Sequence, residues 1–191
     1  MKPIGVDEAG RGPWAGPVVA AAVKFASISD DVASSLKDSK LLSATKRASA
    51  FDSLRRSDSL IGIGWVSAGA IDELGISQAV KQAMHTAVAQ IAKQDEFIII
   101  DGNVNYLSEY YDSVAIIKAD KEILEVSAAS IVAKVMRDRY MNLMARLWPN
   151  YGFDRHFGYG TGLHSQRLEM HGLSPIHRRS FRPMREMDYV N

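Results

Sequence analysis

Short apolar runs, each bounded by glycine or by charged residues, recur through the first two thirds of the chain. Runs of this kind are typical of β-strands. They predict five strands, over residues 3–7, 16–25, 61–68, 97–101 and 113–120. The last two runs are almost wholly apolar, which is expected of strands that are buried on both faces of a sheet.

Longer segments repeat apolar residues at the spacing of an α-helix. They predict helices over residues 43–56, about 77–94, roughly 122–147 and near 161–171. Ser43 is suited to cap the first helix. The buried side of the third should be formed by Val132, Met136, Leu143 and Leu147. Early strands followed by alternating strands and helices predict an α/β fold, with a mixed central sheet flanked by helices and a short helical segment at the C-terminal end.

Composition narrows the class of protein. The chain has 191 residues, 47% of them hydrophobic, which suits a single domain over residues 1–191 with a real core. It has no cysteine, which excludes disulfides and thiolate metal sites. No apolar run is long enough to span a bilayer, and no secretory signal opens the chain. We therefore expect a cytoplasmic monomer with no membrane association and no obligate protein partner, in which Trp65 and Trp148 belong to the core.

Charge is unevenly distributed along the chain. Residues 1–133 hold 13 basic and 17 acidic side chains, whereas residues 134–191 hold 10 basic and 5 acidic ones. Nine of those ten bases are arginine, which binds phosphate in a bidentate manner. An acidic part joined to an arginine-rich part fits a polyanionic ligand together with a metal ion. Two solvated surfaces of opposite sign would give the same pattern, so charge alone does not decide.

Four acids lie at the ends of predicted strands. Asp7, Asp101 and Asp120 each end an apolar run, and Glu8 follows Asp7. The carboxyl ends of strands border the ligand crevice in open α/β sheets, so these acids can converge. Converging carboxylates need a cation among them, and their hard oxygen ligands favour Mg²⁺ or Mn²⁺.

Each acid also has a purely structural interpretation. Asp101 opens an Asp-Gly-Asn turn signal, and Asp120 could cap the helix that follows it. The Asp7-Glu8 pair is harder to explain in this way, because it stands between an apolar strand and a glycine turn. A shared metal site accounts for all four acids together.

Gly10-Arg11-Gly12 follows the acid pair directly. Glycines allow a close approach of the backbone, and exposed N–H groups there can bind phosphate or hydroxyl oxygens. Short glycine motifs are common, so this one is weak evidence for a ligand site on its own. Its position beside the acid pair strengthens that evidence.

The residues around these motifs resemble ribonuclease HII, the type 2 ribonuclease H. The opening GVDEAGRGPWAGPVVAAAV (5–23) is similar to the family's first signature. Further blocks follow in the family's order: DSKLLS (38–43), IIIDGN (98–103), KADK (118–121), SAASIVAKVMRDRYM (127–141), HFGYGTGLH (156–164) and HGLSPIHRRSF (171–181). The resemblance covers nearly the whole chain and implies a ribonuclease H-like fold. Residues of about 150–191 are expected to form a basic helical and loop segment packed on this one catalytic domain.

The resemblance also implies roles for individual residues. Asp7, Glu8, Asp101 and Asp120 would be the metal-binding catalytic acids, with two ions of Mg²⁺ or Mn²⁺. Gly10, Arg11 and Gly12 would contact the 2′-hydroxyl and phosphate at the cut, and Tyr159 would stack on a sugar beside it. Contacts to the nucleic-acid backbone are expected from Lys40, Ser130, Lys134 and Arg137. The basic tail, including Arg178 and Arg179, is expected to reach phosphate as well.

Three positions depart from the family's pattern. Phe157 stands where a lysine commonly precedes the GYGT block, and Leu41 stands where a second lysine often follows Lys40. Trp14 replaces a smaller apolar residue. These changes leave the acids intact but put the phosphate contacts in doubt.

The activity implied is cleavage of the RNA strand of RNA–DNA hybrids, and of ribonucleotides embedded in a DNA duplex, by two metal ions. The products would carry 5′-phosphate and 3′-hydroxyl ends. An integrase- or transposase-like nuclease of the same fold would share the acids without needing the glycine–arginine–glycine loop. A non-catalytic nucleic-acid-binding module would keep the basic tail without gathering acids.

Overall fold

The fold is built on a mixed sheet of five strands. The computed structural model describes residues 2–36, 42–93 and 95–187. Its strands are β1 (Ile4–Ala9), β2 (Val18–Phe25), β3 (Ser59–Val66), β4 (Ile98–Asp101) and β5 (Ser113–Ile116). The order across the sheet is β3-β2-β1-β4-β5; β1, β2 and β3 pair antiparallel, whereas β4 is parallel to both β1 and β5. The expected α/β fold with a mixed sheet is confirmed.

Helices surround this sheet. They are α1 (Asp30–Leu36), α2 (Ala44–Arg56), α3 (Ala68–Leu74), α4 (Ile76–Ala89), the 3-10 turn η2 (Ala119–Lys121), α5 (Leu124–Leu147), α6 (Phe153–His156), α7 (Gly162–His171) and α8 (Met184–Met187). The four expected helices are present, and the hydroxyl of Ser43 caps α2 by accepting from the N–H of Lys46. The short helices α1 and α3 carry too few periodic positions to be predicted. None of the helices in the described ranges is both long and apolar enough to cross a membrane.

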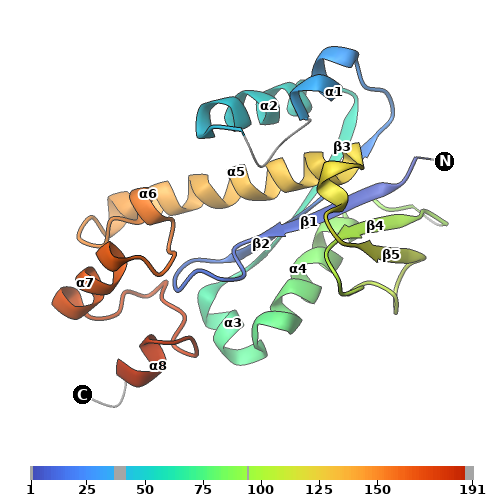
Figure 1. The fold of residues 1–191 in the computed structure, drawn as a ribbon. Helices are drawn as coiled ribbons and strands as arrows, with labels where there is room; N and C mark the ends of the chain where they lie inside the picture. Colours follow the sequence, from blue (N-terminus) through green and yellow to red (C-terminus); the bar gives the residue numbers. More distant parts are fainter. Residues whose placement is uncertain (1, 37–41, 94, 188–191) are drawn as a thin grey trace.

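The two faces of the sheet are covered by different helices (Figure 1). Ala20 and Ala22 of β2 pack in the cluster that includes α4, whereas Ala21 and Val23 pack in the cluster that includes α5 and α2. Small residues let the helices approach closely. A Cβ on Gly64 of β3 would collide with the main chain of α4.

The expected burial of β5 and of one side of α5 is partly wrong. β5 is an edge strand, not one buried on both faces, and Val114 and Ile116 are partly exposed. Leu143 and Leu147 of α5 are 51% and 62% exposed. The reason is that α5 continues past the sheet towards α6 and α7, so a different side of the helix is covered there (Figure 1).

The C-terminal segment packs on the far end of α5 and on the loop after β1. Met141 and Met144 of α5 share a cluster with Ala15 of that loop and with Tyr151 and Phe153. Ala15 also forms a bridge with His177. The loop between β1 and β2 is therefore enclosed by residues far from it in sequence. The two tryptophans expected in the core are instead partly exposed, Trp65 at 40% and Trp148 at 37%.

Candidate active site

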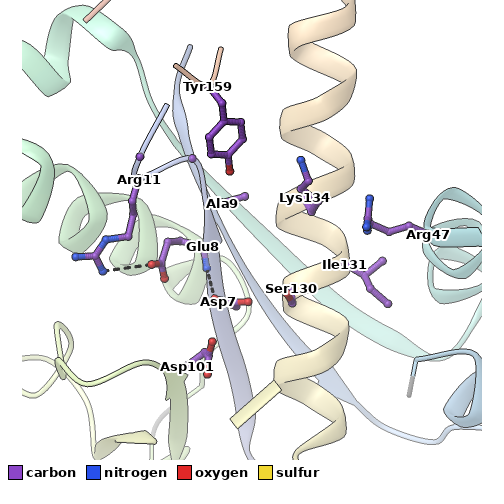
Figure 2. Close-up of a pocket in the computed structure, with 12 residues that line it drawn as sticks. Asp7, Glu8, Ala9, Arg11, Arg47, Asp101, Ser130, Ile131, Lys134 and Tyr159 are labelled. Carbon is purple, nitrogen blue, oxygen red and sulfur yellow. Dashed lines mark hydrogen bonds and ion pairs between the residues drawn. The ribbon is translucent and has the colours of Figure 1, made fainter. Parts of the chain in front are cut away.

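A cavity of about 460 Å³ lies where β1 and β4 end. It is bounded by the loop after β1, by α5 and α2, and by the loop between α6 and α7 (Figure 2). Its lining contains nine of the residues singled out from the sequence: Asp7, Glu8, Gly10, Arg11, Gly12, Asp101, Ser130, Lys134 and Tyr159. Segments separated by up to about 150 residues therefore meet at one site.

Three carboxylates gather at one side of this cavity (Figure 2). β1 and β4 are parallel with Val6 paired to Ile100, which places the next residues, Asp7 and Asp101, side by side. Glu8 extends the group along β1, and its N–H donates to Oδ1 of Asp7 at 2.8 Å. The sheet register thus brings these acids together.

Burial and mutual repulsion oppose ionisation of these acids. The pKa of Asp7 lies well above its usual value, first because the carboxyl is buried, and then because the charges of Glu8 and Asp101 are close; a hydrogen bond with Ser130 partly offsets this. Burial also raises the pKa of Glu8, against the opposing charge of Arg11. A bound cation would relieve this repulsion.

The donor set fits Mg²⁺ or Mn²⁺, which bind carboxylate oxygens. Among the residues that the structure describes, however, no three acid or histidine side chains are close enough to enclose one ion. Asp120 is not at a strand end as expected, because β5 ends at Ile116 and the chain then turns through Lys118, with φ 61°, into η2. The Asp120 side chain is buried, and η2 packs against β4, the strand that ends in Asp101.

The glycines of the loop after β1 have different reasons to be glycine. Gly10 has φ 98°, and a Cβ there would meet the Arg137 side chain and the carbonyl of Pro17. A Cβ on Gly12 would have no heavy atom within 4 Å. Gly10 is therefore required by the fold, whereas Gly12 leaves open space beside the acids.

Arg11 lines the cavity on the same side as Glu8 (Figure 2). One end of its guanidinium donates to Glu8 at 3.3 Å and the other to the hydroxyl of Tyr106 at 3.2 Å. The side chain is nearly half exposed, so the ion pair is weak. Arg11 can exchange these partners for a phosphate.

Tyr159 projects from the loop between α6 and α7 and is 44% exposed. Its carbonyl contacts Nδ1 of the buried His164 at 3.0 Å, and His164 Nε2 lies 2.9 Å from His177 Nε2. Because the N–H of Ser174 donates to His177 Nδ1, that nitrogen must be an acceptor and Nε2 the donor. His164 then accepts at Nε2 and donates from Nδ1 to Tyr159. A chain of neutral histidines thus holds the tyrosine loop, as their lowered pKa values of about 4 require.

Lys134 and Arg47 give the opposite side of the cavity a positive charge (Figure 2). Lys134 pairs with Asp138 at 2.6 Å, and its ammonium lies 5.0 Å from the centre of the Phe157 ring. Arg47 on α2 donates to the carbonyl of Leu42 at 2.9 Å. Acids on one side and bases on the other suit a phosphodiester between them.

Comparison with known proteins supports the family resemblance that the sequence motifs indicated. The family model described as Ribonuclease HII matches residues 4–184. The chain belongs to the ribonuclease HII family. It is 45% identical over 183 residues to a ribonuclease HII of Bacillus cereus, covering 96% of this chain and 70% of that protein. The resemblance found in the sequence is therefore confirmed, and the chain is a ribonuclease H, an endoribonuclease.

Solved structures agree with this membership of the ribonuclease HII family. The ribonuclease H2 of Pyrococcus horikoshii superposes with a TM-score of 0.84 at 27% identity, covering 100% of this chain and 98% of that one. A ribonuclease HII of Archaeoglobus fulgidus, solved in a complex with PCNA, gives a TM-score of 0.77 at 25% identity and covers 92% of each chain. The integrase-like and non-catalytic alternatives are thereby set aside.

Two arginines of this ribonuclease HII are not where the sequence suggested. Arg137 and Arg178 were expected to reach phosphate, but both side chains are fully buried. The guanidinium of Arg137 donates to the carbonyls of Ala15, Pro17 and Phe157. That of Arg178 donates to main-chain carbonyls of the loop after β1. Both expectations are wrong, because a charge pattern does not reveal which bases the fold encloses.

Four further positions bear on phosphate binding or on the family's pattern. Arg47 was missed, although its place one turn into a capped helix after the DSKLLS block was a usable signal. Lys40 and Leu41 lie outside the described residues. Trp14, another departure from the family's pattern, sits against Gly160, where a Cβ would collide with the indole ring.

Proposed function

We propose that this member of the ribonuclease HII family hydrolyses the RNA strand of RNA–DNA hybrids and also cuts on the 5′ side of a ribonucleotide embedded in DNA. The products would carry 5′-phosphate and 3′-hydroxyl ends. The observation that carries the proposal is the meeting of three carboxylates with an open glycine turn in one cavity. The acids supply a place for the reacting phosphate, and the turn supplies a place for the ribose.

Asp7, Glu8 and Asp101, with Asp120 behind them, would hold the metal ions. Two divalent cations, Mg²⁺ or Mn²⁺, would activate water and stabilise the leaving 3′-oxygen. The protein's part is to keep the carboxylates in place: Ser130 hydrogen-bonds Asp7, and the main-chain N–H of Glu8 donates to the same carboxylate. Burial of Asp7 excludes water from that side and strengthens its attraction for a cation.

Recognition of ribose would come from the loop after β1. The 2′-hydroxyl is the group that distinguishes RNA from DNA, and the space beside the α-carbon of Gly12 is open to receive it. Tyr159 would stack on the sugar beside the cut. Lys134 and Arg47 would attract the adjacent phosphates, and such contacts position the duplex without reading its sequence.

The experiment is a cleavage assay on three duplexes of one base sequence: an RNA–DNA hybrid, a DNA duplex with a single ribonucleotide, and an all-DNA duplex. We expect metal-dependent cutting of the first two, with 5′-phosphate and 3′-hydroxyl products, and none of the third. Cutting of the hybrid but not of the single ribonucleotide would remove that part of the proposal. Cutting of the all-DNA duplex would contradict recognition of the 2′-hydroxyl.

A further inference from the structure

Two fully buried arginines hold the loop between β1 and β2 from inside. Their donors reach six main-chain carbonyls at 2.6–3.0 Å: those of Gly10, Arg11 and Gly16 from Arg178, and those of Ala15, Pro17 and Phe157 from Arg137. Hydrogen bonds from a charged donor are worth about twice as much as neutral ones. The backbone of this loop is therefore fixed by residues that are 120 or more positions away.

The bonds from Arg178 determine which way the loop's N–H groups face. In a trans peptide the C=O of one residue and the N–H of the next point in opposite directions. Arg178 draws the carbonyls of Gly10 and Arg11 inward, so the N–H groups of Arg11 and Gly12 face away from it. Within residues 2–36, 42–93 and 95–187, neither N–H donates to another main-chain group. Arg11 and Gly12 both line the cavity.

We propose that Arg178 is a positioning residue for ribose recognition: by binding the carbonyls of Gly10 and Arg11, it aims the N–H groups of Arg11 and Gly12 at the substrate. This rests on the proposed function, because it assumes that the loop contacts the ribonucleotide at the cut. Arg178 itself does not touch substrate. Its contribution is the orientation of groups that do.

The buried cation also adds charge behind the loop. Burial first, and then the nearby charge of Arg137, lower the pKa of Arg178 to about 9. A guanidinium with that pKa is still protonated at neutral pH. It therefore adds a positive field behind the loop, which favours an anionic phosphate on the opposite side, where the cavity lies.

Lysine is the informative replacement. Arg178→Lys keeps the charge but has a single nitrogen, which cannot reproduce a planar fork to three carbonyls. Loosening the loop should affect alignment of the scissile phosphate and so kcat, whereas overall duplex affinity depends on the remaining phosphate contacts. We expect kcat on a single embedded ribonucleotide to fall about tenfold or more, or roughly 1.4 kcal/mol, with a smaller loss on a full hybrid and KM within about twofold.

The control is Met84→Ala, a buried substitution in α4 that does not line the cavity, assayed at a temperature where both variants are folded by circular dichroism. Met84→Ala should lower the melting temperature without changing the ratio of kcat on the single ribonucleotide to kcat on the full hybrid. If Arg178→Lys loses activity on both substrates in equal proportion, as a general loss of folded enzyme would, the proposal is overturned. A kcat within twofold of wild type on the single ribonucleotide overturns it as well.

A second variant covers the case in which Arg178→Lys does not fold. Asp72 anchors the segment that carries Arg178, accepting from the N–H groups of Arg179 and Ser180. Asp72→Ala should produce the same substrate-selective loss, about threefold, since it loosens the segment without removing a buried charge. No change in the substrate ratio would contradict the proposal. Wild-type enzyme is assayed first, so that failure to cut a single ribonucleotide counts against the proposed function and not against Arg178.

Discussion

At the scale of single residues, the two glycines of the loop after β1 separate folding from function. Gly10 has a positive φ and is crowded by Arg137 and Pro17, whereas Gly12 faces open space. A side chain at Gly10 would collide with the protein itself, whereas a side chain at Gly12 could collide only with a bound ligand. We therefore expect substitution of Gly10 to affect stability and substitution of Gly12 to affect activity.

Gly12→Ala should leave the melting temperature within about 2 °C of wild type, because the new methyl group meets no protein atom and Ala restricts the unfolded chain. Cleavage should fall about tenfold or more, since the methyl group occupies the space for the ribose. Gly10→Ala is the matched comparison and should destabilise the fold by more than about 1 kcal/mol. Thermal melts and cleavage rates on the hybrid check both; full activity of Gly12→Ala would refute a contact at that position.

Tyr159 is the second residue with a separable role. Its ring is partly exposed, while its carbonyl is held by His164. Removal of the ring in Tyr159→Ala should cost about tenfold or more in kcat/KM on a single embedded ribonucleotide, since stacking is worth roughly 1–3 kcal/mol, and less on a long hybrid. Tyr159→Phe keeps the ring and should stay near wild type. Equal losses on both substrates would mean that Tyr159 supports the site without sensing the RNA–DNA junction.

At the scale of elements, the register of β1 and β4 was the most predictable part of the site. A short apolar run that ends in an acid is a local signal, and two such strands in parallel place Asp7 beside Asp101. The position of Asp120 was not predictable in the same way. β5 is an edge strand that stops after four residues, so Ile117 and Lys118, the two residues before Ala119, leave the sheet. An edge strand pairs with a single neighbouring strand, so the residue at which it ends depends on that pairing and not on its own apolar run.

The histidine chain behind the α6–α7 loop predicts how stability depends on pH. His164 and His177 have pKa values of about 4, chiefly because of burial, against an ordinary value of 6.5. The unfolded chain therefore takes up protons first as the pH falls, and stability is lost between about pH 6.5 and pH 4, by up to about 1.4 kcal/mol per pH unit for each histidine. Above about pH 6.5 these groups contribute no pH dependence.

The measurement is guanidinium unfolding of wild type and His177→Gln from pH 7 to pH 4.5. Asp7 and Glu8 act in the opposite direction, since their raised pKa values favour the folded state as the pH falls. Both proteins share that effect, so it cancels when the free energy of unfolding of His177→Gln is subtracted from that of wild type. This difference in free energy should shrink steadily below about pH 6.5, and a constant difference would show that His177 is not held neutral.

At the scale of the whole molecule, the C-terminal segment completes a site that the sheet begins. Its basic character is visible in the sequence, but its arginines divide into buried and exposed ones. Arg178 is fully buried and binds a loop 162 residues away, whereas Arg179 is exposed. The sequence shows that a side chain is charged. It does not show whether the folded chain places main-chain carbonyls around that charge and buries it. This is why the meeting of Asp7, Glu8 and Asp101 at one cavity could be expected from the sequence and the burial of Arg137 and Arg178 could not.

The central claim is that the acids at the ends of β1 and β4 hold the cations for cleavage. Asp101→Asn tests it most directly, because the amide keeps the shape of the side chain and removes its charge. The measurement is the cleavage rate of an RNA–DNA hybrid as Mg²⁺ or Mn²⁺ is raised, with hybrid affinity and circular dichroism as controls. The rate should fall at least about a hundredfold at every metal concentration, which corresponds to roughly 2.7 kcal/mol of transition-state stabilisation, while affinity and fold are kept. More than about a tenth of the wild-type rate would contradict the metal site.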